Sequence, residues 1–222
     1  MPFRPTRDID LLGRFDNSEG RVRELIETIC GQEVPDDGLH FDTTDLTTEK
    51  IKEDADYPGV RVQFVCYLDR ARVAMQVDVG FGDAMTPAPK EIEYPVLLDQ
   101  PAPRLRAYSV ETAVAEKLQA MVYLGELNSR MKDFFDVWML FHHEAVARAS
   151  LRAAIVATFA RRKTAIPDDP VCFTPAFGEA KQREWRALLR KFQGSDIPDE
   201  FAVVIRDIRS VMNPIFQELR EL

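Results

Sequence analysis

The most informative stretch of the sequence is GVRVQFVCYLDRARVAMQVDVGF, residues 59–81. Every second residue from Val60 to Leu68 is apolar, and the same period returns from Val73 to Phe81. A side-chain period of two is typical of a β-strand with one buried face. Because only a short L-D-R-A-R turn separates the two repeats, the stretch predicts a hairpin of two long antiparallel strands.

The segments on either side of this hairpin differ in their periodicity. Apolar residues at helical spacing predict a helix over 17–30 before it, and prolines between 87 and 103 break the next segment into short extended pieces. Ser109 is a candidate N-cap for a helical second half. Its helices are expected at about 110–125, 130–146, 149–163, 175–193 and 199–221. The sequence therefore predicts an α+β fold, with a mixed β-sheet and helices in a domain 1–108 and a C-terminal helical domain 109–222.

The composition is that of an ordinary globular protein. Apolar residues make up 45% of the chain, which excludes disorder as the main state. The sequence has no run of roughly 18 apolar residues for a membrane span, and its start does not read as a signal peptide. Three widely spaced cysteines fit a reducing compartment better than a disulfide framework. We therefore expect a cytoplasmic protein with no membrane partner.

Three aspartates on the expected strands form the first candidate site. Asp8 and Asp10 are two apart in TRDIDLL, so on a strand they share one face while Ile9 and Leu11 face the core. Asp78 lies on the polar side of the second hairpin strand. Neighbouring carboxylates repel each other, and a hard divalent cation such as Mg²⁺ removes that repulsion. The pattern predicts a metal site, and the alternative is a solvated strand edge neutralised by nearby arginines.

Charged residues also occur beside the apolar stripes of two expected helices. In SVETAVAEKLQAMVYLG, Lys117 leaves from the apolar stripe, so its ammonium either reaches the surface or enters a cleft where it meets a phosphate. In LNSRMKDFFDVWMLF the spacing allows the ion pairs Arg130–Asp133 and Lys132–Asp136. This second face is either a solvated surface or the wall of an anion site.

Taken together and in this order, RPTRDIDLLGR, GVRVQF, VDVGFGD, SVETAVAEKLQAM and NSRMKDFFDVW resemble one family, the AbiEii/AbiGii-type nucleotidyltransferases. These proteins are toxins of abortive-infection and toxin–antitoxin systems with a DNA polymerase β-like nucleotidyltransferase fold. The resemblance runs from about residue 4 to residue 141 and more loosely through the helical tail. A D-x-D motif alone is a weak signal, whereas the full set in this order is specific.

The resemblance implies roles for individual residues. Thr6, Asp8 and Asp10 match the family's (S/T)-x-D-x-D metal motif, and Thr6 would contact the nucleotide. Asp78 matches the third strand acid, so that the three aspartates would be catalytic and metal-binding. Lys117 matches a lysine expected near the nucleotide phosphates. The last motif adds Arg130 and Lys132 for nucleotide binding and Asp133 and Asp136 as supporting residues.

The reaction implied by the resemblance is transfer of a nucleoside monophosphate from a nucleoside triphosphate (NTP) to a hydroxyl acceptor, with pyrophosphate leaving. Two Mg²⁺ ions are the expected cofactors. The acceptor is either transfer RNA or a protein, and basic residues in 161–163 and 181–191 are candidates for contact with RNA. A cognate antitoxin from a neighbouring gene is the expected partner.

One element of the family pattern does not appear in the sequence. The family opens with a Gly-Gly or Gly-Ser turn whose N–H groups hold phosphate, whereas Met1 stands only seven residues before Asp8. Either the true start lies upstream or the nucleotide site has lost a part. The second case gives the alternative function, a non-catalytic nucleotide- or partner-binding protein that keeps the fold. A metal-dependent phosphohydrolase is a third and weaker interpretation.

Overall fold

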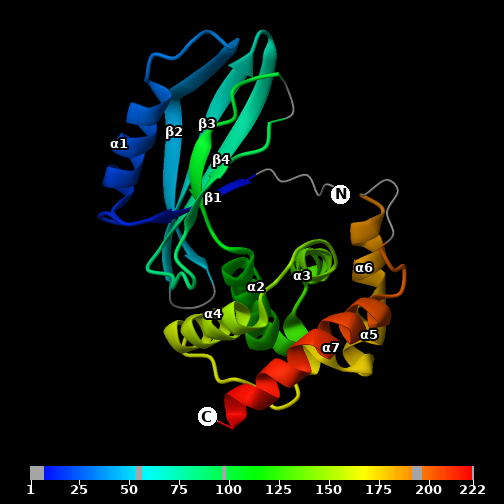
Figure 1. Cartoon of the computed structure of the whole chain (residues 1–222). Coiled ribbons are helices and arrows are strands. Elements are labelled where there is room, and N and C mark those ends of the chain that lie inside the picture. Colours follow the sequence, from blue (N-terminus) through cyan, green and yellow to red (C-terminus); the bar gives the residue numbers. More distant parts are fainter. Residues whose placement is uncertain (1–7, 54–56, 97–98, 192–196, 222) are drawn as a thin grey trace. The chain divides into compact units, whose positions relative to one another are not determined.

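The structure is a computed structural model that describes residues 8–53, 57–96, 99–191 and 197–221 (Figure 1). Contacts between Cα atoms divide the chain into two compact units. The sheet unit falls within Arg4–Asp83 and the helical unit within Ala84–Leu222. This division falls after Asp83, and the expected domain boundary after residue 108 stays a prediction.

The sheet unit contains a mixed four-stranded sheet with the order β1-β4-β3-β2. Its strands are β1 (Asp8–Gly13), β2 (Leu39–Glu53), β3 (Tyr57–Leu68) and β4 (Ala71–Phe81). β3 and β4 form the antiparallel hairpin that the sequence predicts, and β2 pairs antiparallel with β3. β1 pairs parallel with β4, which makes the sheet mixed.

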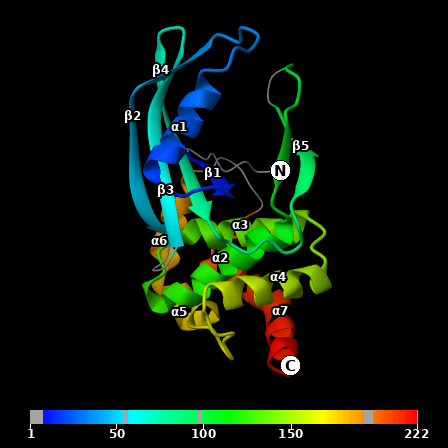
Figure 2. The same cartoon turned by 90° about the vertical axis from the view of Figure 1, so that its left-hand side faces the viewer.

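One face of this sheet is apolar and packs against helix α1 (Glu19–Cys30). Val60 and Val62 of β3 are buried together with Val22 and Ile26 of α1. The helix contacts β2 and β3 and lies along this side of the sheet (Figures 1 and 2). Ser18 caps α1 by accepting a hydrogen bond from the N–H of Arg21, as the preference for Ser at this position predicts.

Ile9 and Leu11 are not buried, contrary to the expectation that they face the core. Their register with Val77 and Val79 places them on the apolar face, but Ile9 is 45% and Leu11 48% exposed. β1 is the edge strand, and the contacts of α1 are with β2 and β3. The edge of the apolar face therefore stays open to solvent.

Strand β2 has no counterpart among the elements expected from the sequence. Its residues HFDTTDLTTEK are mostly polar and do not alternate, so no strand periodicity marks them. The pairing with β3 also shifts between Asp42 and Thr47, as at a β-bulge, which breaks the period further. Pairing with β3, rather than the local sequence pattern, therefore determines that this segment is a strand.

The helical unit begins with the small hairpin of β5 (Lys90–Glu93) and β6 (Arg104–Ala107). Ser109 caps the first helix by accepting from the N–H of Thr112 at 3.1 Å, as expected. The expected helix 175–193 is two helices, because the backbone at Lys181 leaves the helical conformation between them. The helices are α2 (Val110–Leu124), α3 (Met131–His143), α4 (Arg148–Arg161), α5 (Pro175–Ala180), α6 (Gln182–Leu189) and α7 (Phe201–Arg220).

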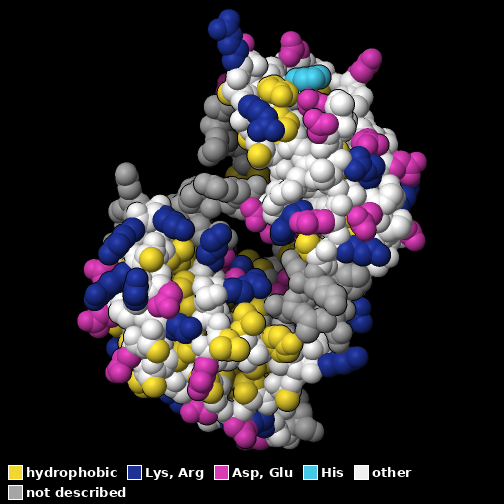
Figure 3. Space-filling model, turned by 180° about the vertical axis from the view of Figure 1, so that it is seen from behind, with side chains coloured by type: hydrophobic (Ala, Val, Ile, Leu, Met, Phe, Trp, Pro, Cys, Tyr) yellow, Lys and Arg dark blue, Asp and Glu magenta, His cyan; other side chains and the backbone are white. Residues whose placement is uncertain are grey.

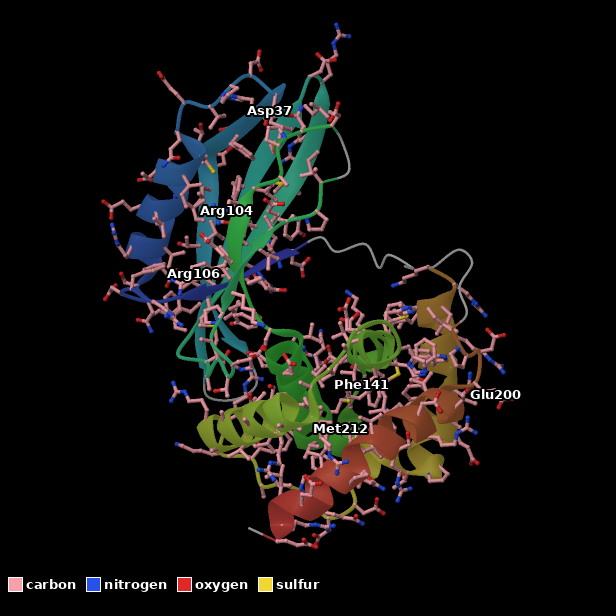
Figure 4. The ribbon with its side chains drawn as sticks, in the orientation of Figure 1. Asp37, Arg104, Arg106, Phe141, Glu200 and Met212 are labelled. Atoms are coloured by element: carbon pink, nitrogen blue, oxygen red, sulfur yellow. The ribbon has the colours of Figure 1, made fainter. Side chains whose placement is uncertain are left out.

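Aromatic side chains fill the core of the helical unit. Trp185 of α6 stacks on Phe201 of α7 with ring centroids 5.0 Å apart, and its indole N–H donates to the carbonyl of Pro198 at 2.9 Å. Met212 of α7 is fully buried, and Phe141 of α3 packs against this core (Figure 4). None of the helices in the described ranges is long and apolar enough to cross a bilayer.

Candidate functional site

The register of the sheet brings charged residues from all four strands into one row on its polar face. Asp10 of β1 is the Cα partner of Asp78 in β4, and Asp78 is the partner of Arg61 in β3. Arg61 is in turn the partner of Glu49 in β2. Because paired residues project to the same side of a sheet, three carboxylates and one guanidinium share this row.

A second polar row runs beside the first. Asp8 is the partner of Gln76, Gln76 of Gln63, and Gln63 of Thr47. These side chains line a groove of about 470 Å³, which continues along the same face toward Tyr67 and Arg72. This volume is within the range of small-ligand sites, roughly 300–1,000 Å³.

Asp78 is buried and bound by Arg61 through both carboxylate oxygens. The guanidinium donates from Nε to Oδ1 at 2.8 Å and from Nη2 to Oδ2 at 2.7 Å. Gln76 adds a longer bond to Oδ2 at 3.3 Å. The hydrogen bond with Asp78, together with the charges of Asp78 and Glu49, raises the pKa of Arg61 further above its ordinary value despite partial burial.

The three aspartates that the sequence predicts as metal ligands therefore differ in their surroundings. Asp8 and Asp10 are exposed carboxylates two residues apart on one strand, and their hard oxygen donors suit Mg²⁺. Asp78 is engaged by Arg61. Across the described residues, no three His, Cys, Asp or Glu side chains are grouped so that they could hold a metal ion.

The remaining candidates lie in the helical unit, where Lys117 of α2 meets two acids of α3. Its ammonium is 2.9 Å from Oδ2 of Asp136 and 3.4 Å from Oδ1 of Asp133. The side chain of Asp133 is only 5% exposed and that of Lys117 25%. The expected pair Arg130–Asp133 is confirmed, with Nε to Oδ2 at 2.7 Å, but Asp133 belongs to the core side of the helix rather than to its surface.

The electrostatics of this cluster keep Lys117 charged. Burial alone would lower the pKa of the Lys117 ammonium, but the carboxylates of Asp136 and Asp133 outweigh it and raise the pKa above its ordinary value. Lys117 is therefore a cation at neutral pH, suited to binding a phosphate and unsuited to taking a proton. Asp136 pairs with this lysine, whereas the sequence spacing had paired it with Lys132, which is exposed.

The sequence patterns did not single out two residues that belong to these clusters, Arg61 and Asn128. Arg61 lies on the same face as Asp78 in the predicted hairpin, so the period of two would have placed them together. Asn128 is fully buried, and its Oδ1 accepts from the N–H of Arg130 at 2.7 Å. No sequence pattern marks this contact. Thr6, the first residue of the proposed metal motif, lies outside the described residues.

We expect Asn128→Ala to lower the free energy of unfolding by about 1.5 kcal/mol, because a buried hydrogen bond at the start of α3 is lost together with side-chain packing. Urea unfolding followed by circular dichroism measures the change. Asn17→Ala is the matched control, since Asn17 is exposed, and we expect less than about 0.5 kcal/mol there. Equal values for the two variants would show that Asn128 does not hold the segment before α3.

The comparison with protein families identifies the chain. The family model for the nucleotidyl transferase AbiEii toxin of type IV toxin–antitoxin (TA) systems matches residues 1–212. The chain therefore belongs to the AbiEii nucleotidyl transferase toxin family, which confirms the resemblance seen in its motifs. The fold is the mixed α+β arrangement with a C-terminal helical region that this family predicts.

Two solved structures are similar to the chain, both from Helicobacter pylori. JHP933 is 16% identical, with 98% of this chain and 78% of that chain covered and a TM-score of 0.46. A protein described as a candidate nucleotidyltransferase is also 16% identical, with 97% and 80% covered and a TM-score of 0.45. No curated protein matches the chain.

Proposed function

We propose that the protein is a Mg²⁺-dependent nucleotidyltransferase that moves a nucleoside monophosphate from an NTP to a hydroxyl acceptor. Membership of a family of nucleotidyl transferase toxins is the basis of this proposal. The register of β1 on β4 links this proposal to particular residues, because it pairs Asp10 with Asp78 and places Asp8 on the same face. The groove that begins at Asp8 is large enough for part of a nucleotide.

Asp8 and Asp10 are proposed to hold the metal ion, because they are exposed carboxylates on one face of a strand that pairs with β4. When bound, Mg²⁺ supplies charge neutralisation for the triphosphate and lowers the pKa of a coordinated hydroxyl. Asp78, which is the neighbour of Asp10 in the charged row, either joins these ligands or keeps its pair with Arg61.

Lys117 and Arg130 are proposed to bind phosphate groups in the helical unit. Lys117 keeps its positive charge because of Asp133 and Asp136, and these acids also fix the position of its ammonium. Arg130 is half exposed and pairs with Asp133, and a guanidinium is a group well suited to binding phosphate. Lys132 is exposed on the same helix and adds a further positive charge.

The acceptor is proposed to be a transfer RNA or a protein hydroxyl. Arg183, Arg186, Arg190 and Lys191 are exposed along α6 and the residues after it, at spacings that place them near one another. Basic and acidic side chains are interspersed over the face shown in Figure 3, which favours a local contact with RNA over general binding. As a type IV TA toxin family member, the protein has an antitoxin as its implied partner.

We expect calorimetry to detect Mg²⁺-dependent binding of an NTP to the wild-type chain and not to an Asp8→Ala/Asp10→Ala variant. The variant loses the oxygen donors that hold the metal ion. A control variant, Glu33→Gln, removes an exposed charge of the sheet unit and should bind as the wild type does.

Two other outcomes would change the proposal. Equal binding by the wild type and the double variant would move the nucleotide site away from Asp8 and Asp10. Binding of nucleotide without transfer to RNA or protein would favour the alternative, a non-catalytic binding protein that keeps the fold.

A further inference from the structure

Three successive residue pairs on the polar face of the β3–β4 hairpin line the groove. In order along the strands they are Gln63–Gln76, Val65–Ala74 and Tyr67–Arg72. The middle pair has small aliphatic side chains, whereas the pairs on either side of it carry polar groups. Residues two positions apart on a strand are roughly 7 Å apart, so the middle pair provides an apolar floor wide enough for a flat ring.

Strand β2 forms one wall of the groove where its register with β3 shifts, between Asp42 and Thr47. Both of these residues and Asp45 line the groove. Oδ1 of Asp42 accepts a hydrogen bond from the N–H of Thr44 at 3.0 Å, which lowers the pKa of the Asp42 carboxyl below its ordinary value. The wall is therefore ionised at neutral pH, so it repels phosphate groups and favours groups that donate hydrogen bonds.

A chain of hydrogen bonds fixes the direction of the two amides in the groove. The carboxylate of Asp78, which Arg61 binds through both oxygens, only accepts hydrogen bonds. Gln76 therefore turns its NH₂ group toward it, with Nε2 3.3 Å from Oδ2, and its Oε1 accepts from Nε2 of Gln63 at 3.1 Å. Because the two polar atoms of an amide lie on opposite sides, the outer end of this chain is an acceptor, Oε1 of Gln63.

An apolar floor beside hydrogen-bond acceptors fits a flat ring whose edge carries N–H donors. Of the parts of a nucleotide, the triphosphate is repelled by the wall and the ribose is not flat. A nucleobase with an exocyclic amino group has both the flat face and the donors. Cytosine and uracil differ at one position in this respect, since cytosine carries an amino donor where uracil carries a carbonyl acceptor.

We propose that this groove binds a nucleobase through its amino edge, and that Oε1 of Gln63 selects cytosine and adenine over uracil. The inference rests on the proposed function, which makes nucleotides the ligands of the chain. The base belongs either to the NTP or to an acceptor RNA, which share this chemistry. Gln76 is a positioning residue, because its bond to Asp78 makes Gln63 present an acceptor rather than a donor.

Nuclear magnetic resonance titration with nucleosides tests the inference without metal, triphosphate or turnover. We expect cytidine to shift the side-chain amide signals of Gln63 and Gln76 in the ¹⁵N-labelled chain. Cytidine should bind at least about tenfold more tightly than uridine, whose carbonyl would lie against the acceptor. Equal affinities for the two nucleosides, or no shift of these signals with either, would overturn the inference.

Two substitutions distinguish a hydrogen-bonding role from a change of shape. Gln63→Leu should bring the affinities for cytidine and uridine to within about twofold of each other, since the acceptor is removed. Gln76→Leu releases the amide of Gln63, which can then donate to uridine, so we expect uridine to bind at least about threefold more tightly than to the wild type. Gln32→Leu, at an exposed glutamine outside the groove, should keep the wild-type preference. A Gln76→Leu variant with that same preference would refute the positioning role.

The same signals identify the source of the base and separate this inference from the proposed function. Displacement of cytidine by CTP assigns the groove to the NTP, and displacement by a cytosine-rich single-stranded RNA but not by CTP assigns it to the acceptor. Displacement by neither overturns the inference. Cytidine binding that RNA displaces, without Mg²⁺-dependent binding of CTP, keeps the inference and removes the proposed NTP site. CTP binding that Asp8→Ala/Asp10→Ala abolishes, with no shift of the Gln63 signal, keeps the proposed function and overturns the inference.

Discussion

An Asp8→Asn/Asp10→Asn double variant is expected to lose nucleotidyl transfer by about three orders of magnitude while remaining folded. The two carboxylates are the proposed ligands of Mg²⁺, and removal of an electrostatic contact to the reacting phosphate typically costs at least 10²–10³ in rate. Both side chains are exposed on the edge strand, so little packing is lost. Transfer of label from an NTP to RNA and to protein measures the effect.

The fold of the double variant is checked separately. We expect its free energy of unfolding to change by less than about 0.5 kcal/mol, as for most exposed positions, and Glu33→Gln provides the reference for a surface charge removed from the same unit. A double variant that keeps more than a tenth of the wild-type transfer would show that the catalytic acids lie elsewhere.

Lys117→Met is expected to lower the free energy of unfolding by about 3 kcal/mol. The substitution leaves Asp133 and Asp136 without the ammonium that lies 3.4 Å and 2.9 Å from them. Breaking a buried ion pair from one side costs roughly 3–5 kcal/mol, and the lower end applies because a quarter of the lysine side chain is exposed. Urea unfolding gives the value.

A matched control and a second substitution make this prediction specific. Arg104→Met breaks an exposed pair with Glu91 in the β5–β6 hairpin and should cost less than about 1 kcal/mol. Adding Asp136→Asn to Lys117→Met should cost less than the sum of the two single changes, since neighbouring charges couple. Strictly additive values would mean that the ion pair contributes nothing.

The same pair predicts how stability depends on alkaline pH. The folded-state pKa of Lys117 is raised above its unfolded value, so its contribution is fully present below the unfolded pKa of about 10.4. It is lost as the pH rises through the folded pKa. The difference in unfolding free energy between the wild type and Lys117→Met should therefore stay constant from about pH 8 to about pH 10 and shrink only as the pH rises further, toward the raised folded pKa. A difference that stays constant at every pH would contradict the raised pKa.

Local patterns were sufficient to predict most of the elements. Side-chain periodicity predicts the β3–β4 hairpin and helix α1. The preference of serine for the N-cap position predicts the cap at Ser109. These signals act within a few residues, so they can be read without knowing what lies across the fold. The polar strand β2 has no such signal, because its partner β3 determines it.

The sequence alone indicated the family and predicted the acids at Asp8, Asp10 and Asp78 as its site residues, because strand period and motif order can be read along the chain. Only the tertiary structure decided their neighbours. The parallel pairing of β1 with β4 places Asp10 beside Asp78. The register of the β3–β4 hairpin places Asp78 opposite Arg61, with which it forms an ion pair.

In the helical unit, the packing of α2 against α3 brings Asp136 into an ion pair with Lys117. The sequence spacing had predicted a pair between Asp136 and Lys132. Such contacts join residues far apart in the chain, and their energies depend on burial and geometry that no local pattern contains.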